Sequence, residues 1–269
     1  MTNHAIDGFN NEIYFVKFQN KNKTLNNPIW SFIINDLNLN YNIENLFLIR
    51  VSNKVFSKIH NYKINAKADV YLASGNIPEE KLLELDYYLD EDSLKKFNLT
   101  PIHNSGISLK KDTSSKFQIM KISPEPFKKL IGNFELGAGA SIFCKKADEI
   151  IKNDAVILGW HTTMQKFKDY FKNIEGIECI DNENENIIKR LGVLKKIKQY
   201  SNSKIEQIVS ESDSISKAIF MGIGIFDEPY TAHYLLSHGK FGINDKYPFT
   251  VTTGSGRSKG KYQLEFKPK

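Results

Sequence analysis

The sequence has little cysteine, little arginine and no long hydrophobic run, and each shortage argues against a class of protein. Its two cysteines, Cys144 and Cys179, are too few for a secreted disulfide framework, so we expect reduced thiols and a cytoplasmic location. No CxxC pair or Cys/His cluster has zinc-site spacing. The longest apolar stretches, such as 46–49 and 155–158, fall far below the roughly 18 residues of a membrane span. The first residues lack a signal-peptide pattern, so we expect a soluble protein without a membrane partner.

What the chain does contain is typical of a globular protein. Its 269 residues are 41% hydrophobic and 25% charged, which predicts one large domain or two modest ones. Lys and Arg number 37 against 31 Asp and Glu, a net charge of +6. This surplus favours a polyanionic partner, although an ordinary solvated surface explains it equally well. Only three of the cations are arginines, so Arg257 stands out in a lysine-rich chain.

The pattern of apolar residues predicts a mixed α/β fold. Residues 9–19 have helical spacing, whereas 46–51 and 66–73 are short, rich in β-forming residues and bounded by turn residues. Residues 79–98 read as an amphipathic helical insertion, and 105–123 as a hairpin with its turn at 112–115. Further helices are expected at 127–131, 145–153 and 163–173, two more within 183–220, and a strand at 221–226.

An acid and a lysine stand out in two of these strands. Asp69 lies in the apolar segment AKADVYLA, where its side chain shares a face with Lys67 and Tyr71. It is either an edge-strand carboxylate facing water or a ligand for a hard cation such as Mg²⁺. Ser108 and Lys110 share a face of the next predicted strand. A carboxylate, a divalent cation and a lysine that orients the nucleophile are the parts that phosphodiester hydrolysis requires.

Asp69 together with Ser108-Leu109-Lys110 resembles the PD-(D/E)xK nuclease signature, and in particular the type II restriction endonucleases. Two positions depart from the pattern: Ala68 replaces the usual proline, and Ser108 stands where Asp or Glu is usual. The resemblance therefore implies that Glu12, on the N-terminal helix, replaces the missing carboxylate and that the Leu109 carbonyl adds a metal ligand. The spacing from Asp69 to Lys110 is long, and the insertion at 79–98 would absorb the excess.

The resemblance implies a restriction-endonuclease-like fold, a mixed β-sheet core flanked by helices, with a C-terminal DNA-recognition region. We expect a catalytic core at 1–150 and a recognition region at 151–269. The implied activity is Mg²⁺-dependent cleavage of double-stranded DNA to 5′-phosphate and 3′-hydroxyl ends, with catalytic residues Asp69, Lys110, Glu12 and Ser108 and metal ligands Asp69, Glu12 and Leu109. A cognate DNA methyltransferase would be encoded nearby. Monomer and homodimer both stay open.

A basic segment near the C-terminus has the composition of a DNA contact. It alternates glycines, small hydroxyls and cations, which suits phosphate binding. Arg257 has the geometry to bind guanine in the major groove, although a solvated tail is the alternative. The candidate DNA contacts are Ser255, Arg257, Ser258, Lys259 and Lys261, with Lys111 and Gln118 near the motif.

Two rival functions remain open. A repair or mobile-element nuclease of the same superfamily would keep Asp69 and Lys110 without strict sequence specificity. A non-catalytic DNA-binding protein would make Asp69 a surface acid. The glycine run 135–141 lacks a nucleotide-binding pattern, so we interpret it as close backbone packing or a tight turn.

Overall fold

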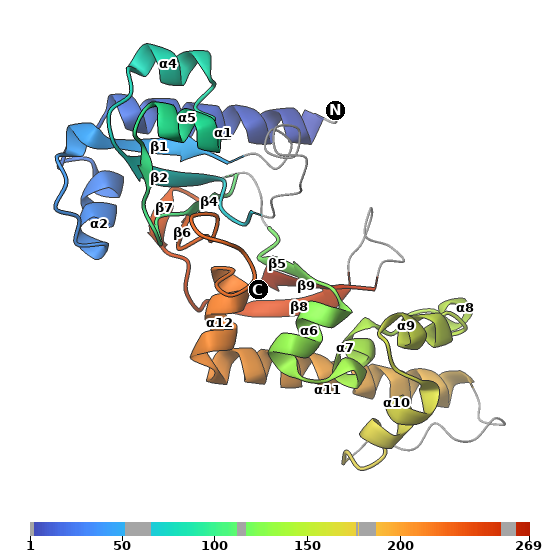
Figure 1. The fold of residues 1–269 in the computed structure, drawn as a ribbon. Helices are drawn as coiled ribbons and strands as arrows, with labels where there is room; N and C mark the ends of the chain where they lie inside the picture. Colours follow the sequence, from blue (N-terminus) through green and yellow to red (C-terminus); the bar gives the residue numbers. More distant parts are fainter. Residues whose placement is uncertain (1–2, 52–65, 112–116, 176, 178–186, 254–261) are drawn as a thin grey trace. The chain divides into compact units, whose positions relative to one another are not determined.

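The computed structural model describes residues 3–51, 66–111, 117–175, 177, 187–253 and 262–269 (Figure 1). The chain divides into two compact units, and each is built from two separate segments. Unit 1 comprises Met1–Ser115 and Phe220–Asp245, and unit 2 comprises Lys116–Ile219 and Lys246–Lys269. The expected division at residue 150 does not coincide with them, because Ile150 ends a helix inside unit 2.

Unit 1 is a mixed β-sheet flanked by helices. The strands follow the order β1-β2-β4-β6-β7, with β3 also paired to β2, and the β4–β6 pair is parallel whereas the other pairs are antiparallel. Its elements are α1 (Asn3–Lys21), α2 (Pro28–Asp36), η1 (Ile43–Asn45), β1 (Leu46–Arg50), β2 (Val70–Ser74), α4 (Glu79–Glu84), α5 (Glu91–Lys96), β3 (Thr100–Pro101), β4 (Ile107–Leu109), β6 (Tyr234–Ser237) and β7 (Lys240–Ile243).

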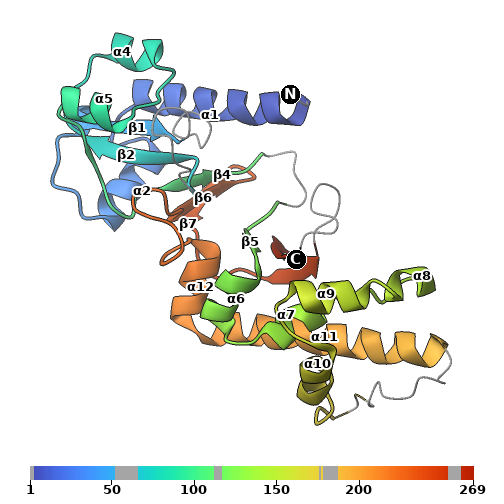
Figure 2. The same ribbon diagram turned by 45° about the vertical axis from the view of Figure 1, so that its right-hand side comes forward.

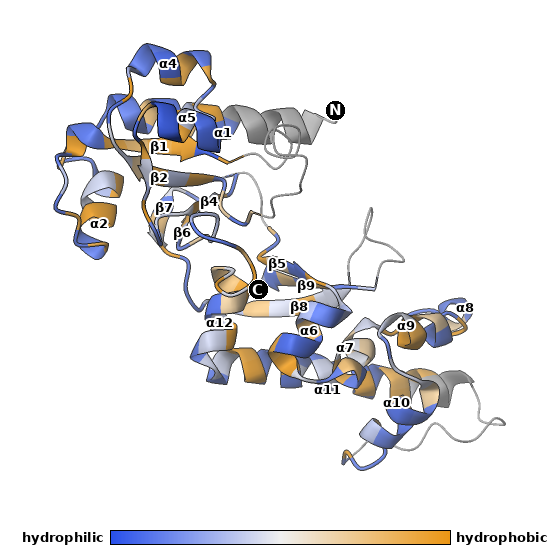
Figure 3. Ribbon diagram, in the orientation of Figure 1, coloured by the Kyte–Doolittle hydropathy of each residue, from blue (hydrophilic) through white to orange (hydrophobic). Residues whose placement is uncertain are grey.

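Strands β1 and β2 form the centre of the unit 1 core. Every residue of both strands is buried, which agrees with the hydrophobic colouring along most of β1 in Figure 3. Helix α1 packs along β1 in both ribbon views (Figures 1 and 2). The Asn20 side chain accepts from the Leu48 amide and donates to the Leu48 carbonyl, both at 2.9 Å. These bonds pair the backbone of the edge strand and fix α1 against it.

A glycine lets β4 approach its neighbours closely. A Cβ atom added to Gly106 would lie 1.7 Å from the Thr231 carbonyl oxygen and 2.9 Å from the Ala68 Cβ. The next residue, Ile107, pairs with Val70 of β2, and its carbonyl accepts from the Asp69 amide at 2.9 Å. Close packing at Gly106 therefore brings the Ser108-Leu109-Lys110 segment beside Asp69.

Unit 2 combines helices with a three-stranded antiparallel sheet of order β5-β9-β8. Gly137 packs against the Trp160 ring and Gly139 against Phe171, so the glycine run serves close packing within a helix. The elements are β5 (Met120–Ile122), α6 (Pro124–Ile131), α7 (Phe134–Ser141), α8 (Ala147–Ile150), α9 (Asn153–Gly159), α10 (Met164–Phe171), α11 (Ile187–Glu211), α12 (Asp213–Phe220), β8 (Phe249–Thr253) and β9 (Leu264–Pro268).

Many expected elements are confirmed, including the N-terminal helix, the strand at β1, and helices at α6, α8, α10, α11 and α12. The strand expected at 66–73 is confirmed only from Val70, so Asp69 lies before β2 rather than in it. The hairpin at 105–123 is wrong, because β4 pairs with β2 and β6 whereas β5 pairs with β9 in the other sheet. The insertion at 79–98 forms two helices rather than one, with the Asp90 side chain capping the second.

The strand at 221–226 is also wrong. Gly222 and Gly224 adopt φ values of +86° and +77° and form a turn there. Within the described ranges, no helix is both long and apolar enough to cross a membrane.

Candidate active site

Asp69 lies immediately before β2, and its carboxylate is bound by the motif segment of β4. Its Oδ2 atom accepts a hydrogen bond from the Leu109 amide at 2.7 Å and one from the Ser108 hydroxyl at 3.3 Å. The Oδ1 atom has no hydrogen-bond partner in the described part of the chain. One carboxylate oxygen is therefore fixed by the protein and the other is available to a ligand.

Glu12 comes from α1 and lies near Asp69. Burial, followed by the negative charge of Asp69, raises the pKa of Glu12 to about 7, against the opposing effects of Arg50 and Lys110. Its Oε2 atom is 3.5 Å from Nη2 of Arg50. In the described part of the chain, Glu12 Oε1 and Asp69 Oδ1 each lack a hydrogen-bond partner, and carboxylate oxygens are the ligands that a hard cation prefers.

Arg50 holds Glu12 in place, and sequence reasoning did not assign it a role. Its side chain is fully buried at the end of β1. Besides Glu12, the guanidinium donates to the Tyr88 hydroxyl at 2.9 Å and to the Asp86 carbonyl at 3.1 Å. A buried guanidinium with several partners is a rigid group, so it limits the positions that Glu12 can adopt.

Two lysines complete the cluster. The charge of Lys110 lowers the pKa of both Glu12 and Lys67, so it lies near both side chains. Burial first, and then Lys110, lower the pKa of Lys67 to about 7, whereas Asp69 acts in the opposite direction. Lys67 is the second residue that sequence reasoning missed as functional. The expected strand face shared by Lys67 and Asp69 is wrong, because both residues precede β2, which begins at Val70.

The donor set fits a magnesium ion. Mg²⁺ prefers oxygen ligands and is usually held by one or two carboxylates with waters and substrate phosphates. Asp69 and Glu12 would supply those carboxylates. Ser108 contacts Asp69 as a hydrogen-bond donor, and Leu109 does so through its amide, so the Leu109 carbonyl as a metal ligand stays a prediction. Among the residues that the structure describes, no group of three or more His, Cys, Asp or Glu side chains is placed to hold a metal.

The expected DNA contacts stay predictions. Lys111 follows β4 in unit 1, and Gln118 is exposed in unit 2. The basic segment lies outside the described residues, and with it Ser255, Arg257, Ser258, Lys259 and Lys261.

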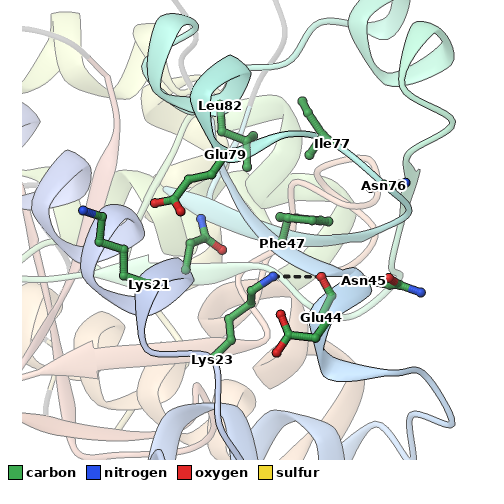
Figure 4. A pocket seen from close by; sticks show the side chains of 10 residues that line it. Lys21, Lys23, Glu44, Asn45, Phe47, Asn76, Ile77, Glu79 and Leu82 are labelled. Carbon is green, nitrogen blue, oxygen red and sulfur yellow. Dashed lines mark hydrogen bonds between the residues drawn. The ribbon is translucent and has the colours of Figure 1, made fainter.

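Unit 1 also contains a cavity of about 690 Å³ at the opposite end of β1 and β2 (Figure 4). There the Lys23 ammonium donates to the Glu44 carbonyl at 2.8 Å and lies 4.1 Å from the centre of the Phe47 ring. Glu44 and Glu79 also line it, so its charges are mixed. It contains none of the site residues expected from the sequence.

No protein-family model and no curated protein sequence matches the chain.

Proposed function

We propose that the chain is a Mg²⁺-dependent endonuclease that hydrolyses phosphodiester bonds of double-stranded DNA, as a type II restriction enzyme does. The observation that carries the proposal is that the charges of Asp69, which directly precedes β2, and of Lys110, which directly follows β4, both act on Glu12 of α1. Acids and a lysine far apart in sequence have no structural need to share one end of a sheet.

The residues have complementary roles in such a reaction. Asp69, fixed by the Leu109 amide, and Glu12, held by Arg50, would bind the cation. When bound, Mg²⁺ lowers the pKa of a water and offsets negative charge on the phosphate. Lys110 orients the attacking water and places positive charge where the phosphate gains negative charge. Ser108 keeps Asp69 oriented rather than binding the metal.

The charge of unit 2 supports DNA as the substrate. Unit 2 contains 23 Lys and Arg against 15 Asp and Glu, a net charge of +8, whereas unit 1 has 14 against 16, a net charge of −2. The positive surplus of the chain therefore lies in the unit without Asp69 and Lys110. In this proposal, unit 1 carries out catalysis and unit 2 binds the DNA backbone.

The test is digestion of a plasmid of known sequence by wild type, Lys110→Ala and the control Lys95→Ala, an exposed position on α5 of the same unit, each in Mg²⁺ and in EDTA. We expect wild type and the control to cut in Mg²⁺ only, and Lys110→Ala to be at least about 100-fold slower. Discrete fragments support a restriction enzyme, and a smear supports a less specific nuclease of the same superfamily. DNA binding without any cutting would support a non-catalytic DNA-binding protein and contradict the proposal.

A further inference from the structure

The sheet of unit 2 has two chemically different faces. Alternate residues of β5, β8 and β9 point to the same side, and the register aligns Lys121 with Glu265 and Thr252. Helices α7 and α11 pack against this sheet, and its apolar residues include the buried Val251, Leu264 and Phe266. The other face, here called the polar sheet face, consists of Lys121, Thr250, Thr252, Glu265 and Lys267.

One carboxylate holds two lysines on this face. Oε1 of Glu265 is 3.0 Å from Nζ of Lys121, and Oε2 is 2.8 Å from Nζ of Lys267. The Glu265 side chain is only 6% exposed, whereas the two lysines remain 38% and 26% exposed. The acid thus lies beneath the cations and reduces their mutual repulsion. Two ammonium groups are held close together, and their charges exceed that of the acid by one.

Such a pair suits the phosphates of a nucleic acid backbone. Lysine binds phosphate as a point charge with rotatable donors, so it fixes position without reading sequence. An anchoring carboxylate lowers the entropy lost when a long side chain becomes ordered on binding. The Thr250 hydroxyl, in register with Lys267, adds a further polar group to the face. The net charge of +8 on unit 2 would attract the polyanion to this unit.

We infer that the polar sheet face is a contact surface for the backbone of duplex DNA, with Lys121 and Lys267 donating to phosphates. The inference rests on the proposed function for its choice of partner and deepens it by naming the surface. It concerns binding alone and requires no hydrolysis.

The test measures binding of a labelled 30-base-pair duplex in EDTA by fluorescence anisotropy at several salt concentrations. The variant Lys121→Gln/Lys267→Gln removes two charges and keeps an amide donor for Glu265 at each position. The control Lys172→Gln/Lys204→Gln removes two charges elsewhere in the same unit, one at the residue that follows α10 and one on α11. The affinity falls as salt rises, and each lost phosphate contact makes the slope of log K against log salt shallower by about 0.9. We expect the slope to become shallower by about 1.8 for Lys121→Gln/Lys267→Gln and to stay unchanged for the control.

Equal slopes and equal affinities for the two double variants would overturn the inference, as would wild type that binds no duplex. Circular dichroism and urea unfolding exclude a loss of fold. Cutting by wild type together with equal slopes would overturn the surface and leave the proposed hydrolysis standing. A shallower slope for Lys121→Gln/Lys267→Gln, with no cutting by wild type, would support the surface and contradict the proposed hydrolysis. A larger effect on single strands than on duplex would overturn duplex DNA as the partner.

Discussion

The Leu109 amide and the Asp69 carboxylate form a 2.7 Å hydrogen bond that joins the motif segment of β4 to the residue before β2. Because the donor is a backbone group, substitution of the Leu109 side chain would leave it in place. The bond orients one carboxylate oxygen and leaves the other open. It connects the local sequence motif to a defined site geometry.

Restoring the usual acid at position 108 gives a sharp test of metal binding. The Ser108 side chain is buried 3.3 Å from Asp69, so Ser108→Asp would place two like charges together. We expect this variant to melt below wild type without metal and to gain more stability from Mg²⁺ than wild type does. Thermal unfolding with and without Mg²⁺ measures both effects. An equal Mg²⁺ shift in the two proteins would contradict a cation at Asp69.

Arg50, which contacts Glu12, also donates to the Tyr88 hydroxyl, so loss of that hydroxyl should destabilise the fold. Tyr88→Phe removes an acceptor from the buried Arg50 guanidinium, and we expect it to lower the free energy of unfolding by about 1.5–3 kcal/mol. The control is Tyr14→Phe on the exposed side of α1, where the side chain is 69% exposed. Urea unfolding compares them, and equal losses would show that the Tyr88 contact contributes little.

Gly106 provides a prediction about the packing that positions the motif. Gly106→Ala would force a methyl group against the Thr231 carbonyl, and we expect a loss of about 1–3 kcal/mol or more. Gly242→Ala in β7 is the matched control, because no neighbouring atom lies within 4 Å of its added Cβ. If the two variants unfold at the same denaturant concentration, β4 does not depend on close approach at Gly106.

Glu265 predicts a pH-dependent stability. Burial alone would raise its pKa, but hydrogen bonds and charge from Lys267 and Lys121 outweigh burial and lower the pKa below its ordinary value. The folded state therefore keeps the carboxylate ionised at a pH where the unfolded chain binds a proton. This stabilisation is complete above the unfolded-state pKa and is lost as the pH falls through the folded-state pKa.

We expect Glu265→Gln to be less stable than wild type at pH 7 by about 1.5–3 kcal/mol, and the difference to shrink below pH 4. Urea unfolding at pH 7 and pH 3 measures both differences. A difference independent of pH would mean that the ion pairs do not act through the charge of Glu265.

The sequence was sufficient for features that depend on local pattern. Alternation within SGISLKK placed Ser108 on a strand and helical spacing placed Glu12 on a helix, whereas Asp69 and Lys110 lie one residue outside β2 and β4. Strand partners were a different matter. Residues 105–123 alternate on both sides of a polar turn, yet their two strands pair in different sheets, because pairing depends on residues far along the chain.

Arg50 could not be assigned for the same reason. It ends an apolar strand, and its partners at Asp86 and Tyr88 lie 36 and 38 residues away, beyond the reach of any local pattern. The burial of Lys67 and the proximity of Lys110 likewise required the assembled sheet, and the expected strand at Lys67 is not formed.

The most direct test of the central claim is a titration with Mn²⁺, a paramagnetic substitute for Mg²⁺, followed by electron paramagnetic resonance. Wild type, Asp69→Asn and Glu12→Gln would be compared with Asp36→Asn, which removes an acid elsewhere in unit 1. We predict that wild type and Asp36→Asn bind an ion that competes with Mg²⁺, and that the other two variants bind it at least about tenfold more weakly. Equal affinity of Asp69→Asn and wild type would contradict a metal site formed by Asp69 and Glu12 beside Lys110.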